Sequence, residues 1–339
     1  MINPTNSVSV KAPLVSVLIV NYNGLRHLPE CLDSLRNQTF QDFEVIVVDN
    51  ASSDGSAEFL RRSFPEVKVV ESAVNLGFSG GNNLGYAHCR GDFIYFLNND
   101  IRAERDALEQ LMALAQSRPG GVFASLLLRY AEPEMADSAG DTVYTCGKTF
   151  SFSGYPASMF TAPRHITSAC AGAAVWPRAA LEKIGLFDAD FFLNYEDLDL
   201  SFRAQHAGIP ILLAPASRIF HKGSATLGGK KSKLSLYYQE RNFILFVLKN
   251  WPLPDLIRFL PALFFVKTWG LFDCLRFGYP GAWLRGNLAA LLFIRGALRN
   301  RKGILGGSRL GPGGFRKLLR KNWLLEKIAY YRGRYDIPL

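Results

Sequence analysis

Residues 92–100 read DFIYFLNND, an apolar run that ends in two amides and a carboxylate. The apolar part is typical of a strand that is buried on both faces of a sheet. Asn98, Asn99 and Asp100 follow it directly. Because ligands of parallel α/β sheets bind beyond the carboxyl ends of the strands, polar side chains at this point predict a binding site.

The same pattern recurs along the first half of the chain. Strand-like apolar runs occupy residues 14–23, 43–56, 67–72 and 92–100, and most of them end in Asn or Asp. Helical spacing is found between and after them, at residues 24–38, 56–64, 80–89 and 105–117. This alternation predicts βαβ units and an α/β fold with a mostly parallel central sheet.

The second half is less uniform. Residues 119–165 are irregular and rich in Gly, Ser, Pro and aromatic residues. Residues 169–188 predict a strand and then a helix from Pro177, residues 191–208 lead into a helix that ends at Gly208, and residues 209–224 predict a strand and a polar turn. We find no internal repeat.

Composition favours a folded protein of one large domain or two smaller ones. The chain has 339 residues, of which 48% are hydrophobic and 20% charged, so a sizeable core is expected and disorder is not. Its five cysteines are odd in number and widely spaced. This spacing indicates neither a disulfide framework nor a zinc site, and it fits a reducing cytosol.

Positive charge is concentrated at the C-terminal end. Residues 1–240 carry 21 Lys and Arg against 25 Asp and Glu, whereas residues 241–339 carry 18 against 4. A basic tail of this kind suggests an anionic partner, either lipid or nucleic acid. We find no nucleic-acid recognition module, which favours lipid.

The pattern of apolar and basic residues near the C-terminus agrees with a lipid partner. From about residue 251 the sequence is apolar with spaced basic residues, and Lys267 and Asp273 interrupt one candidate span. We therefore expect amphipathic helices that lie in the membrane surface, with basic side chains snorkelling and aromatic ones buried. Residues 1–13 lack the apolar core of a signal peptide and are interpreted as a flexible leader.

Two strand ends carry candidate ligand-binding acids. Asp100 offers oxygen ligands to a hard divalent cation, Mg²⁺ or Mn²⁺, although Asp also caps helices well and a helical segment follows. Asp49, at the end of residues 43–49, is placed to bond a ligand base or a ribose hydroxyl. Its alternative role is in the turn itself, because DNASSDGS (49–56) is rich in turn formers.

A glycine-rich segment, NLGFSGGNNLG (75–85), is predicted to be a loop that leads into a helix. Glycines allow backbone N–H groups to approach a phosphate, and a helix N-terminus favours negative charge. The spacing matches neither a dinucleotide fingerprint nor a P-loop.

Adjacent acids open a later helix. Glu196 and Asp197 can raise one another's pKa and supply a general base, or they can simply compensate the helix dipole. For Asp199 we favour that second role, or a contact with Arg203 four residues on.

Two basic residues are further candidates. His221, after a strand, is either a metal ligand or an ordinary loop residue. Arg241, within YYQERNF (237–243), is either a clamp for a diphosphate or part of a structural salt bridge.

Taken together these motifs resemble the inverting family 2 glycosyltransferases of GT-A fold, and most closely their bacterial rhamnosyltransferase-like branch. The resemblance covers residues 14–245 and rests on an ordered set of segments: VSVLIVNYNGLRHLPECLDSL (15–35), VIVVDNASSDGS (45–56), NLGFSGGNNLG (75–85), FLNND (96–100), FLNYEDLDLSFR (192–203) and HKGS (221–224). It implies a GT-A domain at residues 14–248. The composition of residues 249–339 predicts that a basic, apolar, helical, membrane-associating region follows this domain.

The resemblance also implies roles for single residues. Asn98-Asn99-Asp100 takes the place of the metal-binding DxD motif, with an amide where the family has its first acid. Asp100 is then a metal ligand, His221 is a second one, and Asp197 is the catalytic base. Donor binding is assigned to Asn21, Asn23, Asp49, Asn75, Gly80, Asn82, Asn98, Asn99, Glu196 and Arg241, with Asp49 recognising a pyrimidine base.

The function expected from this reading is metal-dependent, inverting transfer of a hexosyl group to a hydroxyl of a lipid-linked or cell-envelope saccharide. dTDP-L-rhamnose is the first choice of donor, and UDP-hexose or UDP-galactofuranose are alternatives. The expected location is the cytoplasmic face of a bacterial inner membrane, as a peripheral protein. A sugar-nucleotide nucleotidyltransferase would need a glycine-rich basic loop after the first strand, which NYNGLRHL (21–28) lacks. A non-catalytic membrane scaffold is the alternative of another class.

Overall fold

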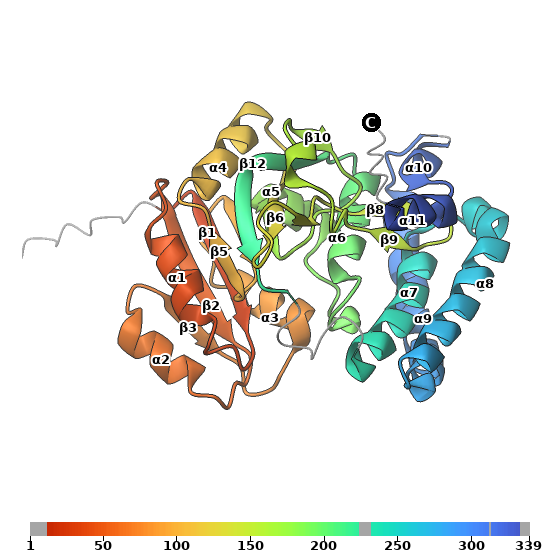
Figure 1. Cartoon of the computed structure of the whole chain (residues 1–339), viewed down its shortest axis with the longest axis horizontal. Coiled ribbons are helices and arrows are strands. Elements are labelled where there is room, and N and C mark those ends of the chain that lie inside the picture. Colours follow the sequence, from red (N-terminus) through yellow and green to blue (C-terminus); the bar gives the residue numbers. More distant parts are fainter. Residues whose placement is uncertain (1–11, 224–231, 312, 333–339) are drawn as a thin grey trace, which may run out of the picture.

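The computed structural model describes residues 12–223, 232–311 and 313–332. Figure 1 shows the strands β1 to β3 with α1 and α2 on one side of the molecule, and the helices α7, α8 and α9 on the other. The leader predicted at residues 1–13 lies almost wholly outside the described residues.

A large mixed sheet forms the centre, with the order β10-β12-β6-β11-β4-β1-β2-β3. Its strands are β1 (Val15–Asn21), β2 (Phe43–Asp49), β3 (Lys68–Glu71), β4 (Phe93–Leu97), β6 (Val122–Arg129), β10 (Arg164–His165), β11 (Ala173–Pro177) and β12 (Ile211–His221), with β5 (Ile101–Ala103) and β7 (Ala136–Ser138) at its margins. The neighbours β3, β2, β1 and β4 run parallel, as do β6 and β12, whereas β11 runs antiparallel to both β4 and β6. The α/β fold with a mostly parallel sheet is confirmed.

Along the long strands of the sheet, alternate side chains point to opposite faces and belong to two separate hydrophobic clusters. In β1, Leu18 belongs to one hydrophobic cluster, and Val17 and Ile19 belong to the other. Helices cover both faces: α1 (Leu28–Arg36), α2 (Ser56–Ser63), α3 (Gly77–Tyr86), α4 (Ala107–Ser117), α5 (Arg178–Ile184) and α6 (Glu196–His206). Burial on both faces explains why the strands read as continuous apolar runs.

Two sequence expectations need correction here. The segment at 119–165, expected to be irregular, contains β6, a fully internal strand between β11 and β12. The glycine-rich segment is mostly helix, because α3 begins at Gly77. The helix predicted from residue 80 thus begins three residues earlier, and the loop that leads into it is correspondingly shorter.

The C-terminal helices pack onto the α/β part through a third hydrophobic cluster. These helices are α7 (Lys233–Asn250), α8 (Leu253–Arg276), α9 (Pro280–Gly306), α10 (Gly314–Lys317) and α11 (Trp323–Tyr331). The cluster joins Phe246 of α7 and Leu263 of α8 to Phe202 of α6. A small sheet of β8 (Thr142–Tyr144), β9 (Thr149–Phe150) and β13 (Leu319–Arg320) adds a second link. Within the residues that the structure describes, no helix has the length and hydropathy needed to cross a bilayer.

Candidate active site

The carboxyl ends of β1, β2 and β4 are joined by a chain of buried polar side chains. Asn99 Nδ2 donates to Asn21 Oδ1 at 2.7 Å, and Asn21 Nδ2 donates to Asp49 Oδ1 at 3.2 Å. The register aligns Asn21 with Asp49 directly, which explains why residues so distant in sequence meet. The other carboxylate oxygen of Asp49 accepts from the backbone N–H of Ser52 at 3.1 Å, so Asp49 also orders the turn after β2.

The adjacent loop residues support this edge. Asn23 has a left-handed backbone with φ of 50°, and its Oδ1 accepts from the backbone N–H of Ser53 at 2.8 Å. Asn75 Oδ1 accepts from Asn50 Nδ2 at 3.0 Å and from the Gly77 N–H at 2.8 Å. Both predicted donor-binding residues thus hold the loops after β2 and β3 in shape.

Asp100 and His221 form the second group of the site. Both are largely buried, and His221 Nε2 lies 3.2 Å from Asp100 Oδ1. On the other side of the ring, Nδ1 lies 2.6 Å from Asp137 Oδ2. Burial would lower the pKa of His221, but hydrogen bonds and the charges of the two carboxylates outweigh it and raise the pKa to about 9. Asp137, in β7, was missed by sequence reasoning because its segment carries no recognisable motif.

Asp197 lies at the start of α6, after a strained turn. Phe192, Asn194 and Tyr195 all have positive φ, between 63° and 74°. Non-glycine residues adopt this conformation rarely, and runs of it are characteristic of functional sites. The turn sets Glu196 and Asp197 side by side at the helix N-terminus.

Both of these carboxyl groups hold protons more tightly than usual. Burial raises the pKa of Asp197, although backbone N–H groups of Leu198 and Ala171 oppose the shift. Burial raises the pKa of Glu196 well above its ordinary value, and the charge of Asp197 adds to this. A carboxyl group with a raised pKa is suited to accept a proton near neutral pH.

The segment before β11 connects Asp197 with the strand ends. Ala171 donates its N–H to Asp197, and the next residue, Gly172, accepts from the backbone N–H of Asn98 at 2.9 Å. Asn98 Nδ2 lies 3.4 Å from His221 Nε2. The predicted base, the amides of β4 and the predicted metal ligands therefore share one edge of the sheet.

Two cavities flank this edge. One of about 280 Å³ is lined by Asp197, Asn194 and Tyr195, and by Gln239, Glu240 and Lys267 of α7 and α8. Another of about 390 Å³ is lined by His221, Asp137 and Lys222. A larger cavity of about 640 Å³ between α6 and α9 holds none of the predicted site residues. Its buried cations, Arg203 and Lys249, are already bonded to Asp199.

The glycines of α3 have a packing role instead of the predicted phosphate contact. A Cβ on Gly85 would lie 2.3 Å from Leu18 Cδ1, and one on Gly81 would lie 2.8 Å from Val20 Cγ1. Gly80 sits within the helix, where its added Cβ would meet Leu76. Asn82 is buried and donates to the Phe78 carbonyl one turn earlier at 2.9 Å. Small residues here let α3 lie directly on β1.

Arg241 also lies in an environment that differs from the prediction. Its Nη2 donates to the Phe191 carbonyl at 2.8 Å and to the Asp190 carbonyl, both in η2 (Ala189–Phe191). Its guanidinium stacks against Tyr238 and Phe293. We correct its role from a diphosphate clamp to an anchor that fixes the strained turn before Asp197. Asp199, in contrast, accepts from Arg203 at 2.9 Å as expected.

The donor set of the second group suits a hard divalent cation. The Asp100 carboxylate and His221 Nε2 lie 3.2 Å apart, so a cation between them would replace the proton that His221 donates to Asp100. Mg²⁺ or Mn²⁺ commonly takes one or two protein ligands together with phosphate oxygens. No group of three or more His, Cys, Asp and Glu residues in the described ranges is arranged to hold a metal by itself.

The comparisons agree with this geometry. Residues 16–185, half of the chain, match the family model described as Glycosyl transferase family 2, and the chain belongs to this family. EpsH of Bacillus subtilis (strain 168) is 36% identical over 109 residues, which cover 31% of each protein. The chain spans less than a third of the length of EpsH and of the next two curated relatives that it matches.

Solved structures show the same fold. The mannosyltransferase PcManGT from Pyrobaculum calidifontis, in complex with GDP-Man and Mn²⁺, has a TM-score of 0.54 at 17% identity and covers 88% of this chain and 86% of its own. GalNAc-T7, solved with UDP, GalNAc and Mn²⁺, has a TM-score of 0.58 at 17% identity and covers 71% of this chain and 48% of its own. The fold is the GT-A type of α/β fold.

Proposed function

We propose that the protein is an inverting glycosyltransferase that uses a nucleotide-diphosphate sugar as donor. The observation that carries this proposal is the position of Asp197, whose carboxyl lines a cavity and is joined through Ala171 and Gly172 to the strand end that bears Asp100. Asp197 would accept the proton of an acceptor hydroxyl as that oxygen attacks the anomeric carbon from the face opposite the diphosphate. A single displacement of this kind inverts the anomeric centre.

Asp100 and His221 are the residues that would hold Mg²⁺ or Mn²⁺. When bound, such an ion neutralises charge on the diphosphate leaving group. Asp49 and Asn21, already fixed by mutual hydrogen bonding, would bind the nucleoside part of the donor at the neighbouring strand ends. Support for a metal and a nucleotide comes from the structural relatives, two of which hold Mn²⁺ together with UDP or GDP-Man.

For the donor we propose a pyrimidine nucleotide sugar, with dTDP-L-rhamnose as the first choice because of the resemblance to the rhamnosyltransferase-like branch. UDP-hexose and UDP-galactofuranose are the alternatives. For the acceptor we propose a saccharide on a lipid carrier at the cytoplasmic face of a bacterial inner membrane. The excess of Lys and Arg after residue 240 supports a location beside anionic lipid.

Thermal shift with candidate donors tests the proposal. We would measure the melting temperature with dTDP-L-rhamnose, UDP-glucose, UDP-galactofuranose and GDP-mannose, each with and without MnCl₂. A ligand that binds only the folded state raises the melting temperature, so one sugar nucleotide should stabilise the protein and do so more strongly with Mn²⁺. Stabilisation by GDP-mannose alone would exclude a pyrimidine donor, and no stabilisation by any of them would refute donor binding.

The same experiment separates enzyme from scaffold. A non-catalytic scaffold predicts no response to nucleotide or metal. The variant Asp100→Asn provides the comparison, because it keeps the side-chain volume but removes the charge of the predicted metal ligand. We expect it to lose the Mn²⁺-dependent part of the shift and to keep the part that the nucleoside supplies through Asp49.

A further inference from the structure

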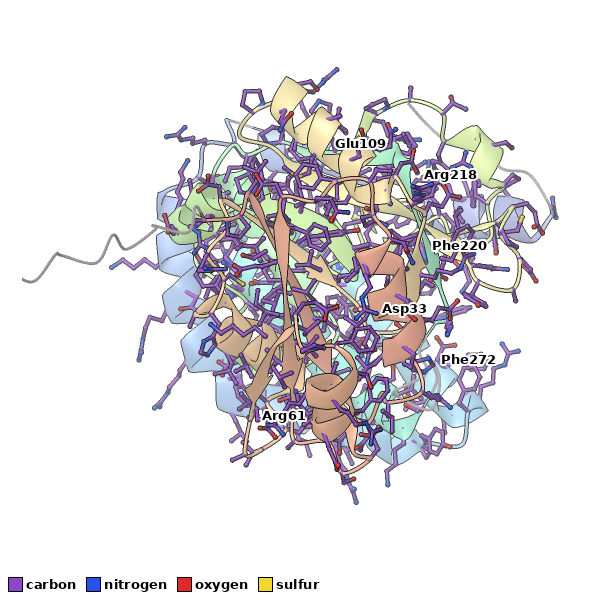
Figure 2. The ribbon with its side chains drawn as sticks, turned by 90° about the vertical axis from the view of Figure 1, so that its left-hand side faces the viewer. Asp33, Arg61, Glu109, Arg218, Phe220 and Phe272 are labelled. Carbon is purple, nitrogen blue, oxygen red and sulfur yellow. The ribbon has the colours of Figure 1, made fainter. Side chains whose placement is uncertain are left out.

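The outward face of α8 is mostly apolar, with Thr268 as an exposed polar residue within it. Six of its large side chains are between 56% and 70% exposed: Leu253, Ile257, Leu260, Phe264, Phe272 and Leu275. They recur at helical spacing and therefore form one stripe, which we call the α8 stripe. Phe272, labelled in Figure 2, lies at the periphery of the molecule.

The opposite face of α8 is already used for packing. Leu263, Val266, Gly270 and Cys274 are buried against the rest of the protein. A helix on a water-facing surface normally has polar residues on its outer side. Exposed apolar surface of this extent marks a site of interaction with another molecule or with a membrane.

The charges around the α8 stripe identify the partner. Arg258 and Arg276 are exposed on the same helix, and residues 241–339 carry 18 basic residues against 4 acidic ones. At the neighbouring α11, Leu324 and Leu325 are exposed, and Trp323 contacts Trp269 of α8 edge-to-face. A second copy of the chain would bring one basic face against another, whereas an anionic bilayer offers apolar chains below and phosphate groups beside the cations.

The inner side of the same helix forms part of the candidate active site. Val266 and Lys267 of α8 line the 280 Å³ cavity that contains Asp197. Lys267 forms an ion pair with Glu240 of α7, which lines the same cavity. One helix therefore separates the α8 stripe from the cavity beside the predicted base.

We propose that α8 lies on the surface of an anionic bilayer through the α8 stripe, and that the cavity beside Asp197 takes the saccharide part of an acceptor anchored in that bilayer. The assignment of the cavity to the acceptor rests on the proposed function. The polar wall of Gln239, Glu240 and Lys267 offers hydrogen-bond donors and acceptors to sugar hydroxyls, and the membrane contact keeps this wall next to the lipid headgroups.

Vesicle flotation of the full chain tests the membrane contact without any turnover. The probes are vesicles of phosphatidylcholine alone and of phosphatidylcholine with phosphatidylglycerol. The variant Phe264→Asp places a charge in the centre of the α8 stripe. The control is Val74→Asp, which makes the same kind of change at a 60% exposed residue between β3 and α3. Far-UV circular dichroism melting confirms that both variants fold.

We expect the wild type to float with the anionic vesicles and Phe264→Asp to bind them at least about tenfold more weakly, since the transfer of one aromatic side chain into lipid is lost. Val74→Asp should bind like the wild type. A second variant, Arg258→Glu with Arg276→Glu, should lose preference for the anionic vesicles. Equal binding by Phe264→Asp and wild type would overturn the proposal, and so would a concentration-dependent dimer that Phe264→Asp dissociates.

Substitution of a residue that lines the cavity tests the second part of the proposal, that this cavity binds the saccharide of the acceptor. Gln239→Ala should weaken turnover with a lipid-linked acceptor extract through a raised KM for acceptor, while vesicle flotation and the nucleotide-dependent thermal shift stay unchanged. Loss of the nucleotide shift would instead place Gln239 in the donor site and overturn the assignment. If no donor stabilises the protein, the proposed function fails, and the flotation result still decides the membrane contact.

Discussion

The His221 ring lies between two carboxylates, Asp137 and Asp100. His221 Nδ1 lies 2.6 Å from Asp137 Oδ2, and His221 Nε2 lies 3.2 Å from Asp100 Oδ1. A carboxylate that accepts from Nδ1 fixes both the orientation of an imidazole and the nitrogen left for a ligand. In this protein it directs Nε2 toward the strand end that carries the amides Asn98 and Asn99.

We predict that Asp137→Asn weakens Mn²⁺ binding by about tenfold or more, because partners of this kind typically change metal affinity by 10- to 100-fold. Isothermal titration of Mn²⁺ in the presence of the stabilising nucleotide measures the effect directly. Asp92→Asn, the same change at an exposed residue, is the control and should leave the affinity unchanged. An unaltered Mn²⁺ affinity in Asp137→Asn would show that Asp137 has no role in orienting His221.

The strand-end residues were predictable from sequence because the periodicity of β1, β2 and β4 already places Asn21, Asp49 and Asp100 at the same edge. Asp137 was not predictable, since β7 has three residues and owes its position to pairing with β6. The glycines of α3 were misread for a related reason. The composition of residues 75–85 suggests a loop, and only contacts with Leu18 and Val20 show that these glycines serve close packing.

Arg241 illustrates a different limit. Its sequence context, among aromatic residues after the last sheet strand, gives no information about which carbonyl groups it meets. The structure shows that it bonds the turn before α6, so its effect on Asp197 is indirect. Charge alone cannot separate a ligand-binding arginine from one that satisfies buried backbone carbonyls.

Asp197→Asn should reduce turnover by about 10²- to 10⁴-fold, the usual contribution of a positioned general base. Donor binding should be spared, which the nucleotide-dependent thermal shift checks. Burial raises the pKa of Asp197 above 3.8, and the base works in its ionised form. Wild-type turnover should therefore fall as pH decreases through this raised pKa. A pH profile without an acid limb above about pH 4 would contradict the assignment.

Close packing of α3 on the sheet gives a stability prediction. A Cβ on Gly85 would lie 2.3 Å from Leu18 Cδ1 and 2.7 Å from Val48 Cγ2, so Gly85→Ala must displace core side chains. We expect it to lower the free energy of unfolding by about 1–3 kcal/mol, as overpacking usually does. Urea denaturation measures this value. Gly303→Ala in α9, whose added Cβ meets nothing within 4 Å, is the control. It should be neutral or stabilising by up to about 1 kcal/mol.

The buried ion cluster that joins α6 to α7 gives the last prediction. Asp199 is fully buried and accepts from Arg203 and from Lys249, each at 2.9 Å. Removal of one partner leaves a charge poorly compensated away from water. Lys249→Met should therefore lower the free energy of unfolding by about 3 kcal/mol at pH 7. Arg36→Met breaks an exposed pair with Glu66 and should cost less than about 1 kcal/mol.

The difference in the free energy of unfolding between wild type and Lys249→Met should depend on pH in a defined direction. Burial acts to raise the pKa of Asp199, but Lys249 and Arg203 outweigh it and hold the pKa below the ordinary 3.8. The unfolded chain therefore takes up a proton at Asp199 at a higher pH than the folded protein does. The stability from this carboxylate is complete above the unfolded pKa and is lost as pH falls through the folded one. The gap between wild type and Lys249→Met in urea should accordingly be constant near neutrality and narrow below about pH 4. Lys249 Nζ also lies 2.6 Å from Asp188 Oδ2, so the comparison is made in an Asp188→Asn background. A gap that widens in acid there would show that Asp199 is not the charge that Lys249 compensates.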